Sequence, residues 1–211
     1  MDIVVITSSH KSENEPTLVT KMFEAGLITL HLRKPKFSTK QLSEYIEQIP
    51  EEFHNRIIIH SHHNLVFKYD LKGVHFTSIH LNRKFKKWWF LRKLRLSGKK
   101  ILKTRAYRKL SEVYKKEEIA FDYYLLGTIF NTLNNELYSG YYDAGLKAAI
   151  KNSGKVFIAR GGVNAVTIGK AKAIGFKGAA LSSMVWKADA PFEKFIEAMN
   201  CAENGNVAQS A

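Results

Sequence analysis

The chain of 211 residues contains little cysteine and no long apolar segment. Its one cysteine, Cys201, lies near the carboxyl end, so no disulfide can form within the chain and nothing supports an oxidising compartment. No apolar run approaches the ~20 residues that a membrane-spanning helix needs. Residues 1–7 lack the basic segment and cleavage site of a signal peptide and are typical of a strand. These absences predict a soluble, cytoplasmic protein.

A glycine-rich Gly-x-Gly-x-x-Gly motif is also absent after the first predicted strand, which disfavours an open dinucleotide-binding sheet. Short β-branched runs instead alternate with segments of helical periodicity, the pattern of strand–helix units around a parallel sheet. Eight units of about 25 residues match the small end of the β/α barrel range. We therefore predict α/β class and one domain, a minimal (β/α)8 TIM barrel over residues 1–202, with a disordered tail at 203–211. The predicted strands are 3–7, 27–33, 57–60, 73–76, 101–105, 123–127, 156–160 and 179–182, and the predicted helices are 16–25, 39–48, 64–69, 84–94, 110–116, 144–151, 165–174 and 191–199.

Acidic residues are too few to balance the basic ones, and the formal net charge is +14. Such a positive field concentrates phosphates, nucleic acids or acidic lipids, and charge alone does not choose among them. Much of the charge lies in residues 83–100, RKFKKWWFLRKLRLSGKK, where aromatic and basic residues interleave. We favour an outer barrel helix that buries Phe85, Trp88 and Leu94 and keeps its lysines hydrated. Binding to nucleic acid or an anionic membrane surface is the alternative.

Candidate phosphate-binding residues follow the seventh and eighth predicted strands. In β/α barrels the active site lies at the carboxyl ends of the strands, where the loops converge above a packed core. Gly161 and Gly162 allow backbone N–H groups to approach an anion closely, and Ser182 and Ser183 add hydroxyl donors. Taken alone, a Gly-Gly pair more often makes only a tight turn, but its position after the seventh strand favours a phosphate site.

Polar residues also end the second, third and fourth predicted strands. Period-two alternation places His31 and Arg33 on one face, and a buried arginine requires an anionic acceptor such as a diphosphate. His60 and His75 lie at the ends of the next two strands, so several imidazoles can converge near the mouth. No His-x-x-x-His or Cys-x-x-Cys pair fixes a ligand geometry, and carboxylates are missing from these strand ends, so we predict no metal site.

Five segments occur in an order that matches one family. They are Leu30 to Arg33, Ile57 to Ser61, Gly73 to His75, Gly127 to Thr132 and Ala159 to Val163. In this order they resemble the Gln-Leu-Arg, Asn-Asp, Gly-Val-His, Gly-Pro-Ile-Phe-x-Thr and Ala-Ile-Gly-Gly-Ile segments of the family that contains thiamine-phosphate synthases and thiazole tautomerases. The resemblance covers essentially the whole chain.

The resemblance implies a β/α barrel enzyme of thiamine biosynthesis. Its synthases join a thiazole phosphate to a hydroxymethylpyrimidine diphosphate, release pyrophosphate and are assisted by Mg²⁺. By this resemblance Arg33 contacts the diphosphate and Thr132 lies beside the loop on the pyrimidine side. The thiazole phosphate is held by Gly161, Gly162, Ser182 and Ser183.

The departures from the family concern the metal and the leaving group. Ser61 stands where an acid is expected, residues 76–80 contain none, Pro35 replaces a basic residue, and residues 132–135 lack the loop lysine. Magnesium is the implied cofactor, yet its expected carboxylate ligands are absent.

Three functions stay open. The first is the synthase reaction with a rearranged diphosphate pocket, and the second is a thiazole tautomerase in which His31 or His60 relays the proton. The third is a non-catalytic protein that binds a phosphate ligand, or a nucleic-acid or membrane surface through residues 83–100. The expected partner is a phosphorylated small molecule rather than nucleic acid, and a homo-oligomer stays open.

Overall fold

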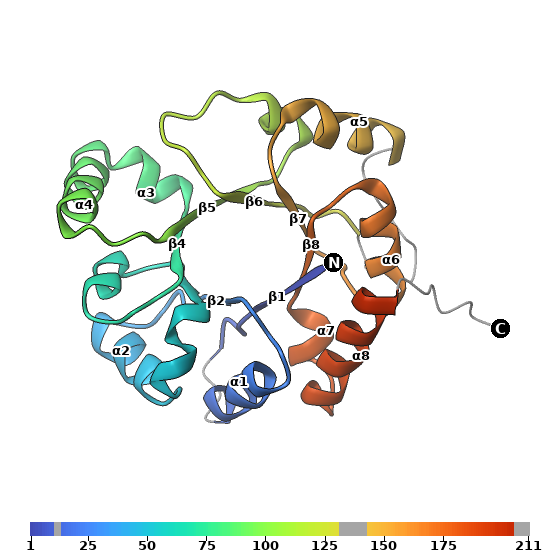
Figure 1. Ribbon diagram of the computed structural model, residues 1–211, viewed down its shortest axis with the longest axis horizontal. Coiled ribbons are helices and arrows are strands. Elements are labelled where there is room, and N and C mark those ends of the chain that lie inside the picture. Colours follow the sequence, from blue (N-terminus) through green and yellow to red (C-terminus); the bar gives the residue numbers. More distant parts are fainter. Residues whose placement is uncertain (11–13, 131–142, 205–211) are drawn as a thin grey trace.

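The computed structural model describes residues 1–10, 14–130 and 143–204. Eight parallel strands close into one barrel in sequence order, and Figure 1 shows them as an inner ring with the helices outside. The predicted (β/α)8 barrel is therefore confirmed. The strands are β1 (Asp2–Ile6), β2 (Leu30–Leu32), β3 (Ile57–Ile59), β4 (Gly73–Phe76), β5 (Leu102–Tyr107), β6 (Tyr123–Leu126), β7 (Phe157–Arg160) and β8 (Gly178–Leu181).

The helices cover the outside of this ring, and several begin at the residues that favour helix starts. Ser38 and Gln41 form a capping box at the start of α2, and Asn164 caps α6 through the backbone N–H of Thr167. The α-helices are α1 (Glu15–Glu24), α2 (Thr39–Glu47), α3 (Ser78–Asn82), α4 (Lys84–Ser97), α5 (Asp143–Ser153), α6 (Ala165–Ile174), α7 (Ser183–Trp186) and α8 (Pro191–Asn204). The 3-10 helices are η1 (Glu51–Arg56), η2 (His63–Phe67) and η3 (Leu110–Tyr114).

Three details differ from the sequence-based expectations. The segments α3 and η1 were not predicted, because neither carries a repeating apolar stripe of useful length. The predicted helices at 64–69 and 110–116 form the short 3-10 helices η2 and η3. Helix α8 continues through residues 203 and 204 of the expected tail, and 205–211 lie outside the described residues.

The exposed face of α4 corrects a further expectation. Phe85 and Trp88 are 75% and 50% exposed, so they are not buried against the sheet as predicted. Leu94 is buried as expected, together with Phe90. The buried positions lie one helical turn apart, and the aromatic residues of the first turns lie on the solvent side. Figure 1 places α4 at the periphery of the barrel.

The barrel interior is divided between an apolar half and a polar half. Its apolar half is formed by the side chains of Val4, Ile6, Leu125, Ile158 and Ala180. On the other side, Leu30 and Leu32 of β2 pack into the outer core, so the alternating residue His31 points inward. The polar half therefore lies under the mouth at β2 to β6, where the predicted site residues gather.

None of the helices among the described residues is long and apolar enough to cross a membrane.

Candidate functional site

A cavity of about 340 Å³ lies at the carboxyl ends of the strands. The residues predicted to bind substrate surround it. Arg33 and His60 line it from the loops after β2 and β3, and the pairs Gly161–Gly162 and Ser182–Ser183 line it from the loops after β7 and β8. His31 lies beneath His60 and does not reach the cavity, because it is completely buried. Thr132 lies outside the described residues.

The first two positions of the loop after β7 require glycine. Gly161 and Gly162 have φ values of +86° and +66°. A Cβ on Gly162 would lie 1.6 Å from the backbone oxygen of Phe130. The Gly161 carbonyl accepts from the Phe130 N–H, and the Gly162 carbonyl accepts from the Thr167 hydroxyl. Both carbonyls are thus held by neighbouring segments.

The backbone N–H groups of the rim stay available for a ligand. Among the loop and turn hydrogen bonds between described residues, none is donated by the amides of Gly161, Gly162, Ser182 or Ser183. These four residues also line the same cavity. The rim therefore offers backbone and hydroxyl donors in the arrangement that an anion requires.

Three arginines add positive charge to this cavity. Arg33, Arg108 and Arg160 all line it. Burial, reinforced by repulsion from the other two guanidinium groups, lowers the pKa of Arg160. The Arg33 guanidinium donates from Nη1 to Ser9 Oγ at 3.1 Å. Guanidinium groups brought together in this way form a strong site for phosphate or diphosphate.

Arg160 and Arg108 were missed as site residues. Arg160 is the last residue of the predicted seventh strand, so its strand-end position was a usable signal. Arg108 escaped because β5 continues to Tyr107, beyond its predicted end at 105.

The loop that carries Arg33 is fixed by buried contacts. The Arg33 backbone N–H donates to Thr7 Oγ1 at 2.8 Å, and the Thr7 hydroxyl donates to the Arg33 carbonyl. The next residue, Lys34, forms a fully buried ion pair with Glu15 at 2.8 Å, and Tyr45 donates to the same carboxylate. The buried side chain of Lys34 therefore fixes the position of Arg33 at the mouth.

The donors of the cavity do not fit magnesium, the cofactor that the resemblance implies. No Asp or Glu occurs among the described residues that line the cavity. Ser61 stands where an acid is expected, and its buried hydroxyl has no hydrogen-bond partner in the described parts of the chain. Mg²⁺ is held through carboxylate and other oxygen ligands, so the imidazoles and guanidiniums present here do not supply its coordination.

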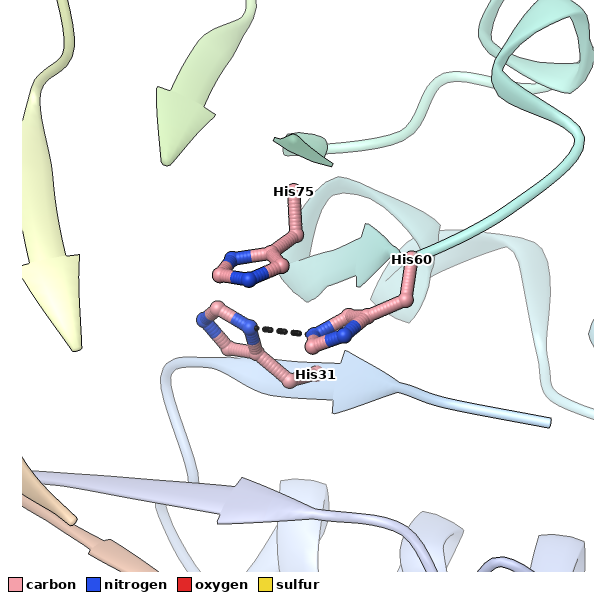
Figure 2. A group of neighbouring side chains, drawn as sticks. All are labelled: His31, His60 and His75. Carbon is pink, nitrogen blue, oxygen red and sulfur yellow. Dashed lines mark hydrogen bonds between the residues drawn. The ribbon is translucent and has the colours of Figure 1, made fainter. Parts of the chain in front are cut away.

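Three imidazoles form the floor of the cavity next to the arginines. Figure 2 shows His31, His60 and His75 pointing toward one another from β2, the end of β3 and β4. His31 Nδ1 and His60 Nε2 share a hydrogen bond of 2.8 Å, and the rings of His60 and His75 stack with centroids 4.1 Å apart. Burial lowers the pKa of His31 to about 3 and also lowers the pKa of His60 and of His75. The three imidazoles are therefore neutral at pH 7. His75 lines the cavity and was not among the predicted site residues.

A family model and two solved structures with similar descriptions match this chain. The family model described as thiamine monophosphate synthase matches residues 3–185. A thiamine phosphate pyrophosphorylase from Bacteroides thetaiotaomicron is 24% identical with a TM-score of 0.75, over 96% of this chain and 98% of that one. A thiamine phosphate pyrophosphorylase from Pyrococcus furiosus is 17% identical with a TM-score of 0.73, over 97% and 96%.

A more distant barrel is the (S)-3-O-geranylgeranylglyceryl phosphate synthase of Thermoplasma acidophilum, solved with its substrate sn-glycerol-1-phosphate. It is 12% identical with a TM-score of 0.65, over 95% of this chain and 92% of that one. A search of curated protein sequences finds no match.

Proposed function

The chain belongs to the thiamine monophosphate synthase family, and on that premise we propose that it couples a thiazole phosphate to a hydroxymethylpyrimidine diphosphate at this cavity. The observation that carries the proposal is that one cavity joins the Gly161–Gly162 and Ser182–Ser183 rim to the guanidiniums of Arg33 and Arg160. Two separate sets of anion-binding groups suit a reaction between a phosphate and a diphosphate.

In this reaction the bond between the pyrimidine methylene carbon and the diphosphate oxygen breaks. The thiazole nitrogen donates its lone pair to the methylene carbon, and pyrophosphate leaves with the electron pair of the broken bond. Arg33 and Arg160 neutralise the negative charge that grows on the leaving group, and the rim holds the thiazole phosphate in line for attack.

The test measures thiamine phosphate formed from both substrates by the purified protein, with Arg160→Gln compared with wild type. We expect Arg160→Gln to lower kcat/KM by at least about tenfold, since a charge-assisted contact contributes about 1.5 to 3 kcal/mol. Arg95→Gln, on the exposed side of α4, is the matched control and should leave the rate unchanged. Absence of product from wild type, with or without divalent cations, would refute the proposal.

A proton-transfer reaction of the thiazole tautomerase type is a second candidate. It is favoured by His60 and His75, because both neutral imidazoles line the cavity and His31 can orient His60 through their hydrogen bond. Turnover of a thiazole tautomer that His60→Gln abolishes, with no thiamine phosphate formed, would support this candidate over the first.

The exposed aromatic residues of α4 favour a role of another class, binding to an anionic membrane surface. Phe85, Trp88 and Trp89 are at least half exposed on a helix that carries six basic residues and no acidic one. Aromatic side chains at the interface and lysines beside lipid phosphates are typical of such contacts. A second copy of this helix would meet it with like charge, which disfavours a symmetric dimer through this face.

This surface role is tested with sedimented vesicles of phosphatidylcholine, with and without phosphatidylserine. We expect salt-sensitive binding to the anionic vesicles that Trp88→Ser with Trp89→Ser reduces strongly. Equal binding to both vesicle types, no binding, or preference for single-stranded RNA would contradict it.

A further inference from the structure

The three histidines of the cavity floor meet the requirements for a metal site that differs from the one expected of the family. Each offers one ring nitrogen, and these nitrogens lie within 4.8 Å of one another. We propose that His31, His60 and His75 bind one divalent transition metal ion of the Zn²⁺ class, with the remaining coordination position open to the cavity.

The closest pair of ligand nitrogens needs only a small change in spacing, and the stacked rings of His60 and His75 have to turn so that both nitrogens point at one ion. The closest pair, Nδ1 of His31 and Nε2 of His60, is 2.8 Å apart and shares a hydrogen bond. Zn–N bonds of about 2.0–2.1 Å in a tetrahedral site place two ligand nitrogens about 3.3 Å apart. Opening this pair by roughly half an ångström and replacing its shared proton by a metal ion reaches that spacing.

The outer contacts of the imidazoles direct their ligand atoms inward. His31 Nε2 shares a hydrogen bond of 2.5 Å with the Tyr123 hydroxyl, which leaves Nδ1 for the centre of the group. His75 Nδ1 shares one of 2.9 Å with Thr104 Oγ1, which leaves Nε2. Metal-binding histidines are oriented in this way by a hydrogen bond at the other ring nitrogen.

The donor atoms favour a transition metal over a hard cation. Burial lowers the pKa of His60 and of His75, so both imidazoles take the neutral form that binds metal. Neutral nitrogen donors suit Zn²⁺, Co²⁺ or Ni²⁺, whereas Mg²⁺ requires oxygen ligands. The alternative is a group of packed histidines. Among the hydrogen bonds of the described residues, however, the inner nitrogens of His31 and His60 bond only to each other, and Nε2 of His75 makes none.

The open position distinguishes a site that can meet substrate from a purely structural one. His60 and His75 line the cavity that also contains Arg33 and the glycine rim, while His31 is completely buried. Three protein ligands with a free position facing a cavity are typical of catalytic zinc sites. A substrate oxygen or a water molecule can therefore reach the metal from the cavity side.

The test uses the untagged full chain, stripped with a chelator and titrated with Zn²⁺ alone and Mg²⁺ alone by calorimetry. We expect one Zn²⁺ per chain and no measurable binding of Mg²⁺. His60→Asn and His75→Asn should each weaken Zn²⁺ binding by at least about 100-fold, because even the loss of an outer-shell partner costs 10–100-fold. Far-UV circular dichroism and cooperative unfolding establish that each variant folds.

A matched control and a spectroscopic readout complete the experiment. His80 lies outside this group, with its ring tilted against that of His63 at a centroid distance of 4.2 Å. It is replaced in His80→Asn, and Zn²⁺ binding should stay at the wild-type value. Co²⁺ should give the intense visible bands of a four-coordinate site in wild type and lose them in His60→Asn. No Zn²⁺ binding by wild type, or Zn²⁺ binding that His60→Asn and His75→Asn leave intact, would overturn the proposal.

Discussion

Replacing Lys34 by methionine should destabilise the barrel strongly at neutral pH. Lys34 Nζ and Glu15 Oε1 are 2.8 Å apart, and neither side chain has any exposed surface. Removing one partner of a buried ion pair leaves an uncompensated charge and costs about 3–5 kcal/mol of the free energy of unfolding. Burial already raises the pKa of the Glu15 carboxyl, and Lys34 opposes this. In Lys34→Met that opposition is lost, so the pKa rises further.

The sign of the pH dependence follows from linkage. A carboxyl whose pKa is higher in the folded than in the unfolded state lowers stability at high pH, and the loss disappears as pH falls below the unfolded pKa. Urea unfolding of Lys34→Met should therefore show a smaller destabilisation at pH 5 than at pH 7.5. Glu15→Gln combined with Lys34→Met should recover much of the loss at pH 7.5, since no buried charge then remains.

The control for this experiment is Lys40→Met. Lys40 lies 3.8 Å from Glu44 and its side chain is 87% exposed, so its loss should change stability by less than about 0.5 kcal/mol. A destabilisation by Lys34→Met below about 1 kcal/mol at pH 7.5, or one that grows on acidification, would refute the reasoning.

Further predictions concern the phosphate rim and the charge. Gly162→Ala forces its Cβ against the Phe130 carbonyl and should abolish the binding of thiazole phosphate that calorimetry measures. The control is Gly154→Ala, since Gly154 has a φ of +64° and its Cβ would meet nothing within 4 Å. This control should cost only about 1–2 kcal/mol of the free energy of unfolding. Ser182→Ala should raise the dissociation constant for thiazole phosphate about fivefold, because one hydrogen bond of about 1 kcal/mol is lost. Unchanged affinity would remove Ser182 from the site. The net charge of +14 should make association rates of phosphorylated ligands fall as NaCl rises in stopped-flow measurements, and salt-independent rates would contradict steering.

The sequence predicted the eight strands because each is a short β-branched or apolar run between turn and cap residues. It could not predict which side of α4 meets the barrel. Aromatic residues at 85, 88, 89 and 90 place apolar groups around the helix, so periodicity alone did not separate Phe90, which is buried, from Trp88, which is exposed. Contact with the sheet decides this, and the sequence does not encode it locally.

The sequence indicated that imidazoles can converge near the mouth, but it did not predict which of them meet, because His31, His60 and His75 come from three strands and meet only through strand register. Ile58 pairs with Gly73 and Ile59 with Val74, so the next step brings His60 level with His75. His31 pairs with Ile58, two residues before His60, and therefore lies one layer deeper on the same inward face. A shift of one residue between β3 and β4 would turn His60 or His75 away from the other. Alternation along β2 places His31 inside the barrel and carries Arg33 to the mouth above it. One strand therefore supplies both the Arg33 guanidinium of the cavity and one imidazole of the histidine group.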